Sequence, residues 1–199
     1  MLPMRAILVE VSQADLARRR RLGADRRDEM WEGVLHMTPA PSTEHQRILD
    51  RLVEWLGPRL RESGRGTLRS GINVFRAEDD YRIPDLTFVA TGHDDRLAED
   101  GVRGGGPDDV IEIRSPGDET SDKLPFFAAL GTPEVIVIDR DTKQPEIFRL
   151  AADAYSESAL DEHGWVVSAT LSVRLRLLPG GPPRLELADD LDPSIRSVI

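Results

Sequence analysis

The sequence predicts a mixed α/β or α+β domain, in which helices flank a central β-sheet. Residues 109–115 and 134–141 are short apolar runs typical of buried strands. Residues 43–60 instead carry apolar side chains at every third or fourth position, as in a helix that buries one face. Residues 146–150 and 164–178 alternate between apolar and polar side chains, which indicates antiparallel strands. Together these patterns predict a sheet covered by helices on at least one face.

The first half of the chain is expected to fold as a helix, a strand, the long helix and two more strands. Ser12 can cap the first helix, whose arginines would form a solvated face. Ser42 or Thr43 can cap the long helix, and Gly57-Pro58 is expected to distort its last turns. The five elements are expected within residues 12–28, 29–37, 43–60, 66–75 and 81–90.

The second half is expected to contain a loop, a short helix and the apolar and alternating strands already described. Residues 92–107 are rich in glycine and charge and indicate a surface loop. Residues 121–130 suit a helix between the two apolar strands. The tail from residue 179 is acidic and rich in proline and glycine, and we expect it to be partly loose. The 199 residues therefore predict a single domain, with its core at about residues 28–178 and a C-terminal tail at 179–199.

Composition and charge exclude several classes of protein. The net charge is −10, which excludes a protein that coats nucleic acid through a basic surface. The chain has no cysteine, which excludes disulfides, thiolate zinc sites and cysteine nucleophiles and fits a reducing cytoplasm. Its longest apolar stretch, residues 124–131, is far shorter than the roughly 20 residues of a membrane-spanning helix. We therefore expect a cytoplasmic protein without a membrane partner.

A charged residue stands inside one of the predicted buried strands. Glu112 lies among Val110, Ile111 and Ile113. A buried carboxylate is costly unless a metal, a cation or a proton compensates it. Arg114 points to the same face because side chains alternate along a strand, so a structural Glu112–Arg114 ion pair is one interpretation.

Asp85 and Lys123 are the other candidates for a site with Glu112. Asp85 follows Pro84 at the head of a strand, where it could also be a simple turn residue. Two carboxylates on adjacent strands can stand about 5 Å apart, and such hard oxygen ligands suit Mg²⁺ or Mn²⁺. Lys123 borders the apolar face of the predicted helix at 121–130 and could reach the sheet, or it could extend to solvent.

His45 and Glu32 are weaker candidates. His45 lies on the apolar face of the long helix, either as a satisfied helix-start histidine or as part of the site. Glu32, beside Gly33, is either a turn carboxylate or an additional acidic ligand. Outside this set, His36, His93 and His163 are expected on the surface, and Glu78-Asp79-Asp80 is expected to be a solvated hairpin turn.

Three linked segments resemble a known family. PDLTFV, DVIEIRSP and DETSDKLPFFAALGTPEVIVIDRD, preceded by WEGVLHMTPAPSTEHQRIL, are similar to the bacterial putative restriction endonuclease family of the PD-(D/E)XK nuclease superfamily, formerly a domain of unknown function. The resemblance covers residues 28–150 and implies a restriction-endonuclease-like core, a mixed central sheet flanked by helices, with a divalent metal.

The resemblance also implies roles for individual residues. Asp85 corresponds to the Asp of the PD motif and Glu112 to the acidic residue of (D/E)XK, so both would bind the metal. The motif lysine would stand at position 114, which is Arg114 here, and Lys123 on the next helix would replace it. Arg114 cannot act as a base near neutral pH because a guanidinium does not release its proton there. Glu32 would suit the additional acidic ligand that the superfamily takes from its N-terminal part.

We therefore expect a Mg²⁺- or Mn²⁺-dependent endonuclease that hydrolyses phosphodiester bonds, with DNA as its substrate. Arg65, Arg69, Arg76 and Arg82 would have to cluster on one face to offset the acidic charge. A symmetric homodimer would suit the cutting of two strands, although the sequence shows no interface.

Two alternatives stay open. One is an inactive nuclease fold that serves as a binding or assembly module in defence or mobile-element biology. Arg114 and the acidic charge favour this module, whereas Asp85, Glu112 and Lys123 favour the enzyme. A glycosidase with paired carboxylates fits less well, because such sites usually lie in aromatic clefts and aromatic residues make up only 5% of this chain.

Overall fold

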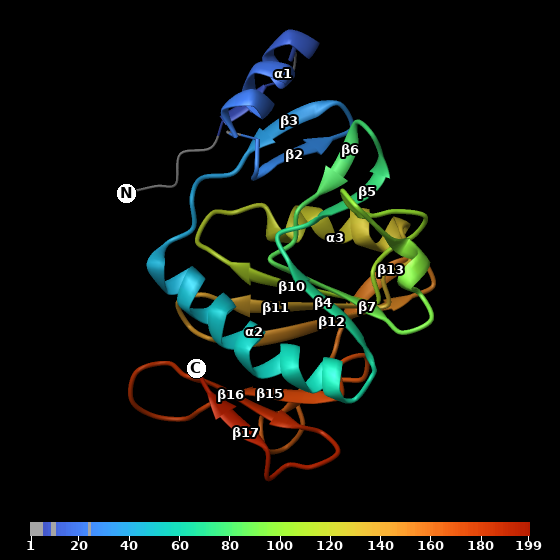
Figure 1. The fold of residues 1–199 in the computed structure, drawn as a ribbon. Coiled ribbons are helices and arrows are strands. Elements are labelled where there is room, and N and C mark those ends of the chain that lie inside the picture. Colours follow the sequence, from blue (N-terminus) through green and yellow to red (C-terminus); the bar gives the residue numbers. More distant parts are fainter. Residues whose placement is uncertain (1–5, 9–10, 24) are drawn as a thin grey trace.

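The structure is a computed structural model that describes residues 6–8, 11–23 and 25–199 (Figure 1). Within these residues, three sheets are combined with three α-helices, which confirms the predicted mixed α/β class. The helices are α1 (Gln13–Leu22), α2 (Thr43–Glu62) and α3 (Thr120–Ala129). Ser12 and Ser42 cap the first two, each accepting a hydrogen bond from a backbone N–H in the first turn.

The central sheet is made of β4 (Gly66–Ser70), β7 (Leu86–Ala90), β10 (Asp109–Arg114), β11 (Glu134–Asp139), β12 (Pro145–Ala151) and β13 (Ala154–Glu157). Its spatial order is β13-β12-β11-β10-β7-β4. β10 and β11 run parallel, and the connection between them is α3. The other neighbours in this sheet are antiparallel. The two apolar runs predicted as buried strands are therefore the middle of the sheet.

A second, N-terminal sheet has the order β1-β3-β2-β6-β5-β9-β8. Its strands are β1 (Ala6–Leu8), β2 (Asp28–Trp31), β3 (Val34–Met37), β5 (Asn73–Ala77), β6 (Asp80–Arg82), β8 (Leu97–Ala98) and β9 (Gly101–Val102). The segment expected as a surface loop, 92–107, thus contributes two short strands and the 3₁₀ turn η1 (Asp94–Arg96).

The chain crosses twice between the N-terminal and central sheets. The predicted strand 66–75 divides at Gly71, which has a φ of 59°, into β4 and β5. The predicted strand 81–90 divides at Ile83-Pro84 into β6 and β7, because proline cannot donate to a ladder. The second crossing places Asp85 at the start of β7, directly where the two sheets meet.

The expectation of a partly loose tail is wrong. A C-terminal antiparallel sheet is formed by β14 (Val166–Ser168), β15 (Val173–Leu177), β16 (Leu185–Asp189) and β17 (Arg196–Val198), so the tail supplies two of its strands. Leu185 and Leu187 are almost completely buried, as is the last residue, Ile199. Burial of these apolar side chains stabilises the tail in the sheet, although proline and glycine residues form the turn between β15 and β16.

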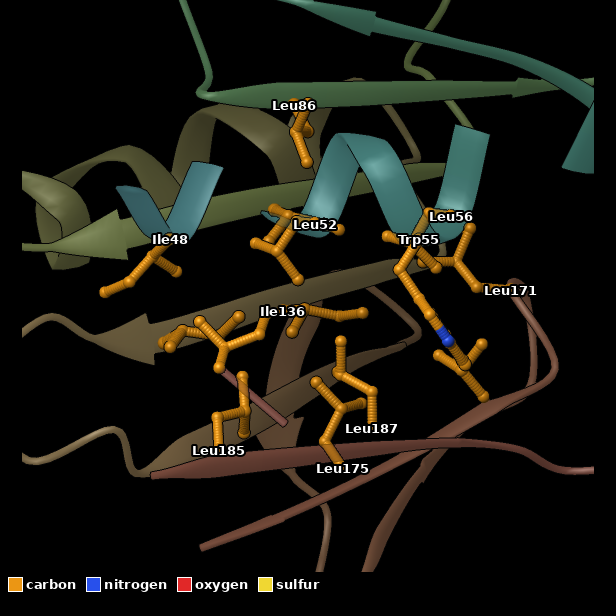
Figure 2. Close-up of a cluster of buried hydrophobic side chains, with 14 of the residues drawn as sticks. Ile48, Leu52, Trp55, Leu56, Leu86, Ile136, Leu171, Leu175, Leu185 and Leu187 are labelled. Atoms are coloured by element: carbon orange, nitrogen blue, oxygen red, sulfur yellow. The ribbon is translucent and has the colours of Figure 1, made fainter. Parts of the chain in front are cut away.

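The main core lies between α2, the central sheet and the C-terminal sheet, as Figure 2 shows. Leu52 and Trp55 of α2 face Ile136 of β11 and Leu175 and Leu187 of the C-terminal sheet. α2 continues past Gly57-Pro58 to Glu62, so the proline does not end the helix. The opposite face of the central sheet packs against α3, with the second core formed by Val74, Val89, Val102, Val110, Phe126, Phe127, Val135 and Val137.

Candidate nuclease site

Two neighbouring strands bring Asp85 and Glu112 together. In the antiparallel β7–β10 ladder, Leu86 pairs with Ile111, so Asp85 and Glu112 occupy the next positions along the same register. Asp85 Oδ2 accepts a hydrogen bond of 2.7 Å from the backbone N–H of Ile113. This bond ties the carboxylate of Asp85 to the strand that carries Glu112, and both residues line one cleft.

Lys123 of α3 extends from the helix to these strands. Its Nζ lies 3.1 Å from Glu112 Oε1 and 2.8 Å from Glu29 Oε1. The side chain of Lys123 is only 13% exposed, and those of Glu112 and Glu29 are 5% and 3% exposed. The ammonium group is thus enclosed between two buried carboxylates, as its position on the helix edge predicted.

The pKa values in this group reflect burial and mutual charge. Burial raises the pKa of Glu112 to about 8, against the attraction of Lys123 and with added repulsion from Asp85 and Glu29. Burial acts to lower the pKa of Lys123, but Glu112 and Glu29 raise it well above its usual range. Lys123 therefore keeps its proton at neutral pH, and the raised pKa of Glu112 favours its protonated form more than in a free glutamate.

Glu29 is the member of this group that the sequence interpretation missed. It lies on β2, where Oε1 accepts from the backbone N–H of Ile83 at 2.9 Å and Oε2 accepts from Trp31 Nε1 at 2.8 Å. The available signal was an acidic residue at the start of a predicted strand, the same feature that drew attention to Asp85. The prediction had instead selected Glu32 from this hairpin.

Glu32 does not lie in the site. It has a φ of 51° at the tip of the β2–β3 hairpin, its side chain is 74% exposed, and it pairs with Arg76 at 2.7 Å. The structure therefore supports the interpretation of Glu32 as a turn carboxylate. Side chains alternate along β2, which directs Glu29 inward, and the chain reverses at Glu32-Gly33.

Arg114 is directed away from Glu112. Its guanidinium makes two hydrogen bonds of 2.8 Å to the Glu146 carboxylate and lies 3.5 Å from Asp139. The structural Glu112–Arg114 ion pair considered from the sequence is absent from the described residues, because Arg114 is satisfied by acids of β11 and β12. Lys123 is the cation that Glu112 contacts.

His45 enters the site from the first turn of α2. Its Nε2 lies 3.1 Å from Asp85 Oδ2, while its backbone N–H donates to the capping hydroxyl of Ser42. His45 is thus both a helix-start residue and a lining residue of the cleft, but it is not fully satisfied, because its buried Nδ1 has no hydrogen-bond partner in the described chain. Asp85 Oδ2 is held from two sides, by this ring and by the N–H of Ile113.

Of three expectations about other polar residues, those for His36 and for the hairpin turn need correction, whereas His93 lies at the surface as expected. His36, expected on the surface, stacks on Trp31 with ring centroids 4.2 Å apart, and its Nδ1 lies 3.1 Å from Glu119. His93 is partly exposed, but its Nδ1 lies 2.8 Å from Asp108 Oδ1. The hairpin turn is solvated at Glu78-Asp79 only, because Asp80 begins β6 and is buried against arginines.

The cleft that contains these groups has a volume of about 1210 Å³. Asp85 Oδ1 and Glu112 Oε2 have no hydrogen-bond partner among the described residues, and both residues line the cleft. No cluster of three or more His, Cys, Asp or Glu side chains that could hold a metal occurs in the described ranges. Two carboxylates fit Mg²⁺, which is commonly bound by one or two carboxylates together with waters and phosphate oxygens.

Comparison with known protein families shows to which family this chain belongs. A family model named Uma2, described as "Putative restriction endonuclease", matches residues 14–179. The chain belongs to the Uma2 family. The match begins before the resembling segments and includes most of α1, the whole central sheet and the site, and it ends before β16 and β17, so the family resemblance seen in the sequence is confirmed.

A solved structure supports the Uma2 fold. The chain is similar to the crystal structure of a putative nuclease belonging to DUF820 from Anabaena variabilis ATCC 29413, with a TM-score of 0.59 and 19% sequence identity. The similarity covers 72% of this chain and 82% of that one. It confirms the predicted restriction-endonuclease-like fold. No curated protein matches this chain.

Uma2 membership places the chain among putative nucleases, for which nucleic acid is the implied substrate. No helix in the part of the chain that the structure describes is long and apolar enough to span a membrane.

Proposed function

We propose that this Uma2 protein is a Mg²⁺- or Mn²⁺-dependent endonuclease that hydrolyses phosphodiester bonds of DNA. The observation that carries the proposal is the convergence of Asp85, Glu112 and Lys123 on one cleft, with an unused oxygen on each carboxylate. In this proposal Asp85 and Glu112 are the metal ligands, and Lys123 is the catalytic cation.

The donor atoms suit a hard divalent cation. Asp85 Oδ1 and Glu112 Oε2 would hold it, together with water and a backbone carbonyl such as that of Ile113, which also lines the cleft. When bound, the metal neutralises the charge of the scissile phosphate and lowers the pKa of a bound water. His45 and the Ile113 N–H position Asp85 by binding its other oxygen.

Lys123 serves as an electrostatic group rather than as a base. The raised pKa keeps its ammonium charged, so it can orient the attacking water and stabilise the negative charge that develops on the phosphate. Glu29 and Glu112 hold Nζ from two directions, which limits its motion before substrate binds. Glu29 is thus a positioning residue for Lys123.

The specific competing proposal is a nuclease fold that binds without cutting. It is favoured by Arg114 at the position of the motif lysine and by the net charge of −10. The position of Lys123 beside Glu112 favours the enzyme, because a charged group stands where the motif lysine is needed. We also place the protein in a reducing cytoplasm, and we regard a homodimer as a suitable form for double-strand cutting.

A plasmid assay separates the two proposals. Supercoiled plasmid is incubated with the protein in millimolar Mn²⁺ or Mg²⁺, in the same buffer with EDTA, and with Glu112→Gln as the matched variant. The enzyme proposal predicts relaxed or linear plasmid only for the wild type with metal. Intact plasmid in every arm, at protein concentrations where a mobility shift shows that DNA is bound, would instead establish the inactive module.

A further inference from the structure

Most arginines of a segment next to the cleft make no ion pair with the rest of the described chain. We define the basic arm as the five exposed arginines Arg18, Arg20, Arg21, Arg26 and Arg27. None of them forms an ion pair with any residue that the structure describes. α1 has no buried residue, so its arginines do not serve a hydrophobic contact either. In Figure 1, α1 projects from the end of the molecule that carries β2 and β3.

The fold holds this segment at the site. Gly23, with a φ of 61°, ends α1, and its N–H bonds to carbonyls of the last turn. The chain then turns directly into β2, whose Glu29 contacts Lys123. Arg19, between the free arginines, donates to the buried Asp28 carboxylate at 2.7 Å and fastens α1 to the start of that strand. Arg27 is therefore only two residues from a member of the site.

The basic arm also lines the cleft itself. Arg26 and Arg27 are on the wall of the cleft that contains Asp85 and Glu112. A second hollow beside it is lined by Arg20, Arg26 and Arg69. Arg26 belongs to both, so the basic arm borders both hollows, of which the second is also lined by Asp25, Asp28, Glu78, Glu99 and Asp100.

Most of the four arginines that would have to cluster to offset the acidic charge form other contacts. Arg65 donates to the carbonyls of Thr170 and Leu171. Arg76 pairs with Glu32 and Asp80, and Arg82 is buried against Asp80. The condition that these four arginines cluster on one face is thus not met, because most of these side chains connect elements of the fold. Arg69 alone among the four borders the second hollow.

We propose that the basic arm binds the phosphate backbone of duplex DNA and directs it into the cleft. The inference rests on the proposed nuclease function and assigns the contact that an acidic protein needs to hold its substrate. Unpaired guanidiniums suit phosphate oxygens because they donate two parallel hydrogen bonds. Charge complementarity also fits an acidic protein surface. The position of Arg26 and Arg27 on the wall of the cleft favours DNA, because the substrate must reach that cleft.

The experiment measures binding of a 20-base-pair DNA duplex in EDTA by fluorescence anisotropy at several salt concentrations. The test variant is Arg20, Arg26 and Arg27→Gln, which leaves the Arg19–Asp28 contact and the metal ligands intact. The control is Arg51, Arg61 and Arg184→Gln, three exposed arginines that do not line either hollow and whose removal changes the net charge equally. Asp85→Asn serves as a variant with an altered metal site.

The proposal predicts a weaker affinity for the test variant. The slope of log Kd against log salt concentration should also fall by about one per arginine, or up to about three in total. The control should bind like the wild type, and Asp85→Asn, which removes a negative charge from the cleft, should not weaken binding. Equal slopes for the test and control variants, or no DNA binding by the wild type, would overturn the proposal. So would a change in oligomeric state of the test variant without DNA, measured by light scattering, because the arm would then serve a protein contact.

Cleavage is measured separately on plasmid with Mn²⁺. If the slope changes as predicted but no protein cuts, the basic arm stands and the nuclease function fails. If the wild type cuts and the test variant binds and cuts equally well, the nuclease function stands and the basic arm is wrong.

Discussion

Lys123 Nζ lies 2.8 Å from Glu29 Oε1, which links the helix after Glu112 to a strand near the start of the described chain. The same ammonium is 3.1 Å from Glu112. One cation thus joins the N-terminal sheet, the central sheet and α3 at the cleft. The N-terminal hairpin is therefore part of the site and not only a covering element.

The first prediction concerns this contact. Glu29→Gln should lower the rate of plasmid cleavage about 10–100-fold, because the supporting carboxylate no longer holds Lys123. Stabilisation by Mn²⁺ should persist, since Asp85 and Glu112 are unchanged. Glu32→Gln, on the same hairpin but 74% exposed, is the matched control and should cleave like the wild type. Equal losses in both variants would show that Glu29 has no special role.

The second prediction separates the two candidate cations. Lys123→Gln should reduce cleavage about 100–1000-fold, as loss of a group that stabilises transition-state charge does. It should also lower the melting temperature, because two buried carboxylates lose their partner. Arg114→Gln should retain activity and lose less than about 1 kcal/mol of stability, since its ion pairs are about 30% exposed. A larger loss of activity for Arg114→Gln than for Lys123→Gln would reverse these assignments.

Part of this site could be predicted from local sequence because its acidic residues are unusual at their positions in the predicted strands. Glu112 stands within an apolar strand, and Asp85 follows a proline that interrupts a strand. Their partner Lys123 could be placed on the correct helix face from its spacing to Phe127 and Leu130. These are local signals, and each depends on a short segment.

The N-terminal part of the site could not be predicted in the same way. Whether Glu29 or Glu32 faces the cleft depends on where the hairpin reverses, and a shift of the turn changes which side chains point inward. The burial of the tail was missed for a related reason: Leu185, Leu187 and Ile199 pack in one core with α2 and the central sheet, which lie far from them in the sequence. Such long-range packing has no local signature.

The third prediction concerns pH and a buried acid away from the cleft. Asp109 on β10 is paired in register with Glu134 on β11, both are buried, and neither Asp109 oxygen has a hydrogen-bond partner in the described chain. Burial and the neighbouring Glu134 raise the pKa of Asp109 well above its ordinary value. Glu134 also lies 3.2 Å from Arg149, so Asp109 is the member that keeps the proton.

A raised carboxyl pKa makes the folded state hold a proton that the unfolded chain has released above about pH 4. The free energy of unfolding should therefore fall as pH rises from 4 toward the pKa of folded Asp109. Asp109→Asn should flatten this dependence, because the amide stays neutral. Urea unfolding between pH 5 and 8 measures it, with exposed Asp153→Asn as the control. An unchanged slope in Asp109→Asn would contradict the interpretation that buried Asp109 holds this proton.

The central claim is that Asp85 and Glu112 together hold a divalent metal. Calorimetric melting of the wild type, Asp85→Asn and Glu112→Gln, with and without millimolar Mn²⁺, tests it most directly. Metal at a hundredfold excess over its Kd should raise the wild-type melting temperature by about 5–10 °C, because it binds only the folded site. Both variants should fold without metal and largely lose this increase. An equal increase in all three proteins would contradict the claim and would place the metal elsewhere.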